Sequence, residues 1–367
     1  MIPHATKGPV HVVGSGLLGA SAGLALRALG VEVTLADTSP TALAVAQQVG
    51  AGRPGPANRP SLVIVAVPPD VTALVVAAQL QAHPKAVVTD LASVKSAIVQ
   101  YLSQVGADLT RYVGSHPMAG REQTGPAAAV ADLFTGRPWV ITAPPASSQE
   151  AILAVRDLAT DLGASVQYLD PAPHDEAVAL VSHVPQVIAS LLAARLVDAA
   201  EGALNLAGQG LRDVTRIAAS NPDLWGAILA ANGGAVAPIL RSIQLDLNET
   251  IAALETGAQP EQLGQTLVKL NGLISAGNQG VKRIPGKHGG ARQVFDQVVV
   301  LVPDRVGAMA KLFALLEQGG VNLEDLRLEH AAGQAVGRAT LSVPQGKGQG
   351  LARSLEEHGW SVLSCAV

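Results

Sequence analysis

The chain has 367 residues, a net charge of -4 and a single cysteine, Cys365, and these features exclude several classes of protein. An acidic balance without a run of basic residues argues against a nucleic-acid surface. One cysteine allows neither an internal disulfide framework nor a thiolate metal cluster, and we expect no bound metal. Apolar runs are short and interrupted by Pro or Gly, and the N-terminus lacks a signal-peptide pattern. We therefore expect a soluble, cytoplasmic protein without a membrane partner.

The length predicts two or three domains, and changes of composition along the chain favour three. Residues 1–171 alternate between apolar strands and helices, as in a Rossmann-type, doubly wound α/β domain. Residues 172–285 are helical in character. A Gly/Lys-rich linker at 286–292 leads to a small α+β domain at 293–367. Aromatic residues make up only 2% of the chain, so the cores must consist of Ala, Val and Leu.

A glycine-rich motif near the N-terminus is typical of dinucleotide-binding proteins. A strand at 10–13 runs into Gly14-Ser-Gly16-Leu-Leu-Gly19 and then into an Ala/Leu-rich helix. Gly14 permits the tight turn, Gly16 lets the backbone approach a pyrophosphate, and Gly19 lets the helix pack closely on the strand. The residues that we expect to bind the cofactor are Gly14, Ser15, Gly16, Leu17, Leu18, Gly19, Asp37, Val67 and Pro68.

Asp37 indicates which dinucleotide this motif is expected to bind. It ends a second predicted strand, 31–37, about 20 residues after the glycine turn, where a carboxylate can accept hydrogen bonds from a ribose diol. A carboxylate here repels a 2′-phosphate, so the sequence favours NAD over NADP. The structural alternative is a helix cap or turn residue before Thr38-Ser-Pro.

The remaining strands of the first domain place several polar residues at strand ends. We predict strands at 61–67, 86–90, 111–114, 138–142 and 165–168, and a helix from about Gln149. In an open parallel sheet, ligands bind outside the carboxyl ends of the strands. The glycine turn, Pro68, Ser93 and His116 all follow strand ends, so we expect them to share one crevice.

The segment Gly114-Ser-His116-Pro-Met-Ala-Gly120-Arg121-Glu122 indicates where the chemistry takes place. It sets one histidine at a strand end, with a cation and a carboxylate just beyond, and His116 is expected to face the substrate of a hydride transfer. Structural alternatives remain for each polar residue. Ser93 would cap a helix beginning at Val94, Lys95 would be a first-turn surface residue, His116 would bond to backbone, and Glu122 would simply be solvated.

The helical region carries a proline and two arginines that require an explanation. A long helix is predicted from Asp175, and it contains Pro185, which should kink it. Asn221 is a predicted N-cap before a proline and an acid. Arg212 and Arg216 share a helical face at i,i+4 and form either a salt-bridged surface or an anion site. Apolar residues at helical spacing over 240–254 indicate a core or a subunit interface.

Five segments together resemble the prephenate/arogenate dehydrogenase family of tyrosine biosynthesis, over residues 8 to about 285. They are Gly14-Ser-Gly16-Leu-Leu-Gly19, Asp90-Leu-Ala-Ser93-Val-Lys95, Gly114-Ser-His116-Pro-Met-Ala-Gly120, Ser182-His183-Val-Pro185 and Arg212-Asp-Val-Thr-Arg216-Ile-Ala. The resemblance implies NAD-dependent oxidative decarboxylation of prephenate to 4-hydroxyphenylpyruvate, or of arogenate to tyrosine. It also implies a homodimer formed through the helical domain.

The resemblance implies a role for each candidate residue. His116 would bond the ring hydroxyl and accept its proton, Ser93 would help orient His116 and the hydroxyl, and Arg216 would pair with the ring carboxylate. A histidine pKa near its usual value suits that proton transfer. The substrate-binding residues are expected to be His183, Arg212, Glu122 and Gln186. Two positions depart from the family pattern: Arg212 stands where the family often has Lys, and Gln186 where it often has a second histidine.

The C-terminal residues form a module of their own. Strands and helices in the order βαββαβ are predicted over 293–367, which is the split βαβ, or ferredoxin-like, arrangement. The Val-Pro-Asp304-Arg-Val-Gly307 turn and the Gly-Val-Asn322 turn resemble the ACT domain, a family of amino-acid-sensing modules that pair edge to edge. That resemblance implies tyrosine as a feedback inhibitor bound near Asp304, Gly307 and Asn322. The alternative is a dimerisation domain that binds no ligand.

Two other functions agree with parts of the sequence. A 6-phosphogluconate-type hydroxyacid dehydrogenase also joins a Rossmann domain to helices, but it needs a catalytic lysine early in the helical domain, and residues 172–268 contain none. An NAD-binding amino-acid sensor built on an inactive dehydrogenase is the non-enzymatic alternative. Intact Ser93, His116 and Arg216 argue against it.

Overall fold

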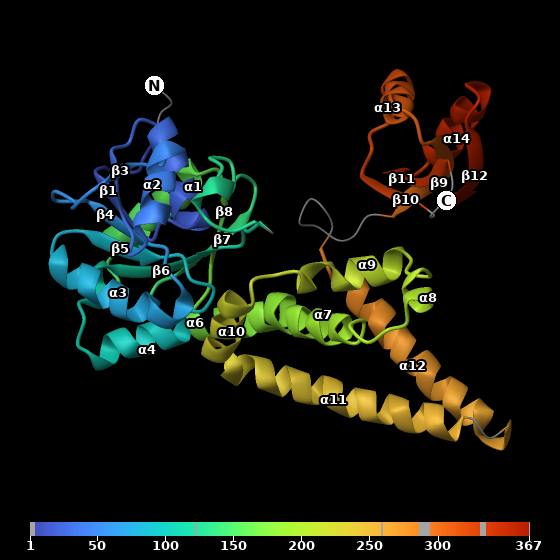
Figure 1. Cartoon of the computed structure of the whole chain (residues 1–367), viewed down its shortest axis with the longest axis horizontal. Coiled ribbons are helices and arrows are strands. Elements are labelled where there is room, and N and C mark those ends of the chain that lie inside the picture. The colour runs from blue at the N-terminus through green and yellow to red at the C-terminus, as the bar shows by residue number, and fades with distance from the viewer. Residues whose placement is uncertain (1–3, 122, 258–259, 286–293, 331–334, 367) are drawn as a thin grey trace. The chain divides into compact units, whose positions relative to one another are not determined.

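The computed structural model describes residues 4–121, 123–257, 260–285, 294–330 and 335–366 (Figure 1). The predicted linker at 286–292 lies outside these residues. The chain divides into two compact units. The first consists of Met1–Ala199 with Val214–Leu245, and the second of Ala200–Asp213 with Asp246–Val367.

The first unit contains an eight-stranded sheet with the strand order β3-β2-β1-β4-β5-β6-β7-β8. The strands are β1 (Val10–Val13), β2 (Val33–Ala36), β3 (Arg53–Pro54), β4 (Leu62–Val65), β5 (Val87–Asp90), β6 (Tyr112–Pro117), β7 (Pro138–Thr142) and β8 (Ser165–Tyr168). The order changes direction between β1 and β4, and such a switch point is where doubly wound folds bind ligands. The Rossmann-type fold is confirmed.

One part of the sheet departs from the predicted parallel arrangement. β7 pairs with β6 in the antiparallel direction, while β8 is parallel to β7. A parallel return requires a crossover, usually a helix. Between β6 and β7 the described residues contain only one short 3-10 turn, η2 (Pro126–Ala128), so the chain reverses direction there. The short strand β3 was not predicted.

Helices cover both faces of this sheet. Leu62 and Ile64 of β4 pack into a cluster with α1 (Leu17–Ala28), α2 (Pro40–Gln48) and α5 (Gln149–Asp161). Val63 and Val65 of the same strand face the opposite cluster, which contains α3 (Pro69–Ala82) and α4 (Ser96–Gln104). A strand buried on both faces reads as a continuous apolar run, as the sequence of β4 does.

The glycine turn depends on close backbone contacts. Gly14 has a φ of +98°, and a Cβ there would lie 2.3 Å from the carbonyl oxygen of Ala66. A Cβ on Gly19 would lie 1.9 Å from the carbonyl oxygen of Gly14. Gly16 differs, because a Cβ there would meet nothing within 4 Å. Gly14 and Gly19 therefore serve the fold, and Gly16 leaves space beside the turn.

The region after β8 is helical, as predicted, but its first helix is broken. α6 (Pro171–Val178) passes into one turn of π-helix, η3 (Ala179–His183), and then into α7 (Val184–Ala194). Pro185 stands in the first turn of α7, where its missing N–H costs little. The predicted kink is a π turn, and the helix starts before Asp175.

The later helices complete this region. They are α8 (Glu201–Leu204), α9 (Gln209–Thr215), the 3-10 turn η4 (Arg216–Ala218), α10 (Pro222–Ala231), α11 (Gly233–Thr256), the 3-10 turn η5 (Pro260–Gln262) and α12 (Leu263–Lys282). Asn221 caps α10 by accepting a hydrogen bond from the Leu224 N–H, as predicted. Leu240 and Ile243 of α11 pack against a core with Ala179 and Val184.

By length and composition alone, the helical run Pro171–Ala194 is apolar enough to cross a membrane. Four polar side chains on it, those of His174, Asp175, His183 and Gln186, are nevertheless buried and hydrogen-bonded within the first unit. Buried polar side chains with hydrogen-bond partners inside the protein are typical of a core helix of a globular unit rather than of a lipid-facing helix.

The C-terminal sheet confirms the predicted βαββαβ arrangement. Its elements are β9 (Phe295–Pro303), α13 (Ala308–Gln318), β10 (Asp325–His330), β11 (Val336–Pro344), α14 (Gly348–Glu357) and β12 (Ser361–Ala366). The strand order is β10-β11-β9-β12, with every pair antiparallel. Gly307 caps α13 with a φ of +84°, which explains a glycine at that turn.

The glycine turn can be tested by unfolding experiments. We expect Gly19→Ala to lower the free energy of unfolding by about 1–3 kcal/mol, because the new methyl group overlaps backbone that cannot move freely. Gly16→Ala is the matched control, since its methyl group meets open space, and it should leave the melting temperature near that of the wild type. Thermal unfolding of the full chain measures both variants, and equal destabilisation would contradict the structural role of Gly19.

Candidate active site

A cavity of about 860 Å³ lies within the first unit, beyond the carboxyl ends of β4, β5 and β6. It brings together seven of the predicted site residues, which come from the glycine turn, the strand ends and the helical region: Leu18, Val67, Ser93, His116, His183, Gln186 and Arg216. Ser93 and His116 therefore share a cavity, as predicted, whereas the turn glycines and Pro68 do not line it. Arg121 and Trp225 also line it.

Other predicted residues lie elsewhere. Some of these belong to the turns after β1, β2 and β4 or to the first turn of α1, and they are not among the residues that line this cavity: Gly14, Ser15, Gly16, Leu17, Gly19, Asp37 and Pro68. Arg212 belongs to the second compact unit, so its pairing with Arg216 stays a prediction. Glu122 lies outside the described residues. Asp304, Gly307 and Asn322 belong to the C-terminal sheet domain.

The glycine turn is held to β2 by Asp37. Its carboxylate accepts hydrogen bonds from the backbone N–H of Ser15 at 2.5 Å and of Ser39 at 2.7 Å. An ionised carboxylate offers about four acceptor positions, so two remain for a ribose diol. Ser15 Oγ is buried and has no hydrogen-bond partner among the described residues. This unsatisfied hydroxyl and the open space at Gly16 fit a dinucleotide.

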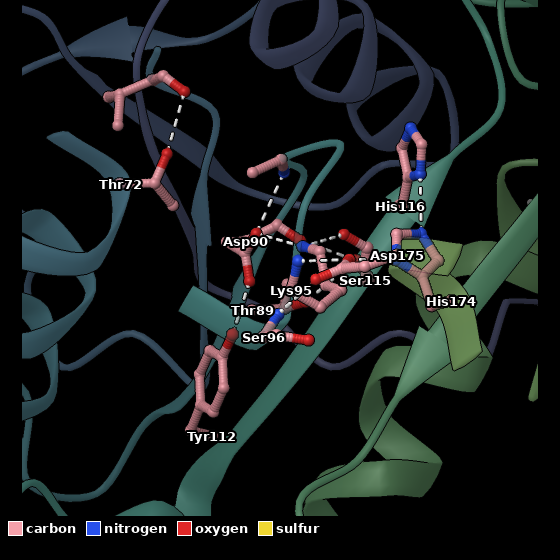
Figure 2. A network of polar contacts seen from close by, with 12 residues as sticks. Thr72, Thr89, Asp90, Lys95, Ser96, Tyr112, Ser115, His116, His174 and Asp175 are labelled. Carbon is pink, nitrogen blue, oxygen red and sulfur yellow. Dashed lines mark hydrogen bonds and ion pairs between the residues drawn. The ribbon is translucent and has the colours of Figure 1, made fainter. Parts of the chain in front are cut away.

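His116 is hydrogen-bonded to a residue that the sequence analysis did not select. Its Nδ1 lies 2.9 Å from Nε2 of His174, and Nδ1 of His174 lies 2.8 Å from Oδ1 of Asp175 (Figure 2). His116 is only 9% exposed and His174 is fully buried. The histidine is thus bonded to a side chain of α6 rather than to backbone, which excludes the structural alternative considered for it.

Asp175 connects this pair to the start of helix α4. Its carboxylate accepts hydrogen bonds from the backbone N–H groups of Lys95 and Ser96, each at 2.8 Å. Burial alone would raise the pKa of Asp175, but the hydrogen bonds from His174 and Ser96 lower it overall. The carboxylate therefore stays ionised at neutral pH.

The environment of His116 changes its acidity. Burial, together with His174, Lys95 and His183, holds the pKa of His116 well below its usual range, while Asp175 acts in the opposite direction. The expected ordinary histidine pKa is therefore wrong. Desolvation disfavours the charged imidazolium, so the neutral ring persists at neutral and mildly acidic pH.

Lys95 is buried, which excludes a first-turn surface role. Its ammonium pairs with Oδ1 of Asp90 and donates to the carbonyl oxygen of Ser115 at 2.7 Å (Figure 2). Oδ2 of Asp90 accepts a hydrogen bond from the Tyr112 hydroxyl at 2.7 Å. These contacts join the end of β5 to β6 directly behind His116. Removing one member would leave an uncompensated buried charge, so the network is structural.

Ser93 lines the cavity but does not bond to His116 in the described structure. Its Oγ is buried and has no hydrogen-bond partner among the described residues. It does not cap a helix either, because α4 begins at Ser96. The expected orientation of His116 by Ser93 is therefore not seen, since His174 occupies that role. An unsatisfied buried hydroxyl beside a cavity is suited to a ligand atom.

The helical side of the cavity carries two polar side chains in fixed positions. Nδ1 of His183 accepts a hydrogen bond from Nδ2 of Asn232 at 3.0 Å, and its ring meets Trp225 edge-on. Burial lowers the pKa of His183 to about 4, so this ring is neutral too. Nε2 of Gln186 donates to Oγ of Ser220 at 2.8 Å. These bonds hold His183 and Gln186 toward the cavity.

Sequence reasoning missed Trp225, which lines the cavity, and four residues that act through other side chains: Asp90, His174, Asp175 and Asn232. The only sequence signal for His174 and Asp175 is their place at the start of a mostly apolar helical run. Without a partner those side chains would be costly to bury, so the pair itself predicts a hydrogen-bonding role. Its partner, the start of α4, is far along the chain and leaves no local trace.

Comparison with known proteins agrees with these features. Residues 22–168 match the model of the prephenate dehydrogenase nucleotide-binding domain, and residues 170–269 match that of the prephenate dehydrogenase dimerization domain. A probable prephenate dehydrogenase, NovF, from Streptomyces niveus is 34% identical over 357 residues, which is 96% of this chain and 99% of that protein.

Solved structures give the same result. Prephenate dehydrogenase from Aquifex aeolicus, in complex with hydroxyphenyl propionate and NAD+, aligns with a TM-score of 0.62 at 25% identity over 74% of this chain and 99% of that one. Arogenate dehydrogenase from Synechocystis aligns with a TM-score of 0.58 at 28% identity over 73% of this chain and 99% of that one. The chain therefore belongs to the prephenate dehydrogenase family.

Proposed function

We propose that the chain catalyses the NAD-dependent oxidative decarboxylation of prephenate to 4-hydroxyphenylpyruvate. The observation that carries this proposal is the cavity itself. It exposes a neutral, oriented histidine, His116, in the same space as Leu18 and Val67 beside the dinucleotide turn. The Aquifex relative was solved with NAD+ and an aromatic hydroxyl compound, which supports the same pair of ligands here.

Residues around the glycine turn would hold NAD. The N-terminus of α1 and the space at Gly16 suit the pyrophosphate, and Asp37 suits the ribose diol. When bound, NAD accepts the hydride that leaves ring C4. Ser15 Oγ supplies a further hydroxyl for the cofactor, since it is buried beside the turn without a partner among the described residues.

His116 and Arg216 would contact different groups of the substrate. His116 takes the ring hydroxyl proton as C4 loses its hydride, and returns it to the phenol oxygen after CO₂ leaves and the ring becomes aromatic. Arg216 pairs with the ring carboxylate, for which a planar guanidinium is suited. Ser93 donates its unsatisfied hydroxyl to the substrate. Because aromatisation makes the reaction strongly downhill, the protein mainly positions the reactants.

Substrate side-chain recognition separates prephenate from arogenate, which differ by a keto or an amino group. His183 and Gln186 are the candidates, with Arg212 and Glu122 as further predicted contacts. Similarity to the Synechocystis arogenate dehydrogenase keeps arogenate as the second candidate substrate. Gln186 offers both an amide donor and an amide acceptor, so its chemistry agrees with either side chain.

Assembly and regulation complete the proposal. Residues 1–171 would bind the cofactor, 172–285 would form a homodimer, and 293–367 would form an ACT-like domain that binds tyrosine and pairs with a second copy. Apolar side chains of α11 and α12 that are exposed in the single chain support the dimer: Leu245, Leu247, Ile251, Leu254, Val268 and Ile274. We expect a soluble cytoplasmic enzyme.

The catalytic assignment predicts different kinetic effects for two variants. With NAD and prephenate, His116→Asn should lower kcat by about two to four orders of magnitude and leave KM near its normal value, as expected for losing one acid/base group. Arg216→Ala should mainly raise the KM for prephenate and leave the Kd for NAD unchanged. Absorbance of NADH follows both, with arogenate assayed in parallel. Turnover of His116→Asn at the wild-type rate would contradict the role of His116.

The pH dependence follows from the lowered pKa of His116. Because the ring stays neutral below the usual histidine pKa of about 6.5, kcat/KM for prephenate should remain level as pH falls through 6.5 and decrease only in more acidic solution. The charged neighbours that face it are Lys95 and Asp175, and the titratable rings are His174 and His183. An inflection at or above pH 6.5 that disappears in His116→Asn would show that the base has an ordinary pKa.

Feedback by tyrosine can be tested in the full chain. Asn322→Ala, combined with Asp304→Ala, should raise the tyrosine concentration needed for half-inhibition by about 30-fold, because each of the two lost hydrogen bonds weakens binding by about 1 kcal/mol. Inhibition is measured against turnover of the same variant without tyrosine. Unchanged inhibition would place tyrosine in the active-site cavity rather than in the C-terminal domain.

A further inference from the structure

We propose that His174 and Asp175 are positioning residues that set the tautomer of His116, so that its Nε2 carries the lone pair that receives the substrate proton. This inference rests on the proposed function for its kinetic consequence, but not for the tautomer itself. Neither residue is among those that line the cavity, so both would act through His116.

The direction of the hydrogen bonds is set first at the N-terminus of α4. The Asp175 carboxylate receives the backbone N–H groups of Lys95 and Ser96, which can only donate. An ionised carboxylate is acceptor only, and Oδ1 is also 2.8 Å from Nδ1 of His174. The proton of that contact must therefore belong to His174 Nδ1, which fixes the tautomer of the second ring.

The tautomer of His174 in turn determines that of His116. A neutral His174 with its proton on Nδ1 has only a lone pair on Nε2, and that atom lies 2.9 Å from Nδ1 of His116. His116 must therefore donate from Nδ1, and its Nε2 is left as an acceptor (Figure 2). Which nitrogen of a histidine carries the proton is set by the bond that the other nitrogen makes. In this chain, the hydrogen bond between His174 and Asp175 and the one between His116 and His174 together determine which nitrogen of His116 is protonated.

The bonds from His116 through His174 to Asp175 also stabilise the positive charge that forms on His116 during the reaction. When Nε2 of His116 takes a proton, a cation appears in a buried position near Lys95, which is unfavourable on its own. The negative charge of Asp175 opposes this, reaching His116 through His174. The fully buried ring of His174 thus connects a carboxylate held by helix α4 to the reacting histidine.

The tautomer can be measured without a substrate. In the full-length protein labelled with 15N-histidine, at neutral pH, the His116 signal should show a protonated Nδ1 and a bare Nε2, and it is assigned by its absence from His116→Asn. A wild-type spectrum with the proton on Nε2 would overturn the inference whatever the variants do. This measurement remains valid even if neither prephenate nor arogenate is turned over, so it is independent of the proposed function.

Two substitutions at His174 separate positioning from packing. His174→Phe keeps a ring and removes both nitrogens, and we expect kcat to fall about 10–100-fold with little change in KM, while His116 loses its single tautomer. His174→Gln can accept from His116 and donate to Asp175, and should recover kcat to within about tenfold of wild type. Wild-type kcat in a folded His174→Phe protein, or equal losses in both variants with the His116 tautomer unchanged, would contradict the role.

Discussion

The carboxylate of Asp175 is the contact on which the active site depends. It accepts the free N–H groups at the start of α4 and the Nδ1 proton of His174, so one side chain connects the loop after β5, helix α6 and, through His174, strand β6. A carboxylate at a helix N-terminus is favoured by the free N–H groups and by the helix dipole. The packing of α6 against α4 therefore helps to fix the position of His116 relative to the cavity.

Burial lowers the pKa of the reacting histidine, His116, and so makes it a weak base. His116 is buried beside His174, Lys95 and His183, so the neutral ring is favoured over the imidazolium. The neighbouring ion pair of Lys95 and Asp90 holds the backbone of β5 and β6 together without offering a proton to the cavity.

Local patterns predicted most of the fold. The glycine turn, the apolar strand β4, the cap at Asn221 and the βαββαβ tail all depend on residues close in sequence, and the structure confirms them. The direction of β7 and the π turn were missed, because they depend on the length of a loop and on packing against other helices. The cavity residues His116, Ser93, His183 and Arg216 were predicted from motifs. His174, Asp175 and the buried state of Lys95 require partners distant in sequence, which no periodicity reveals.

The π turn η3 constrains how this protein can change over evolution. A π turn is a helical turn with one additional residue, so deleting one residue from Ala179–His183 would restore a regular α-helix. The deletion would rotate helix α7 about its axis, because each residue turns a helix by about 100°. Gln186 would then turn away from the cavity, and the apolar packing of α7 would need a new register. The length of this segment therefore fixes both the place of Gln186 in the cavity wall and the packing of α7.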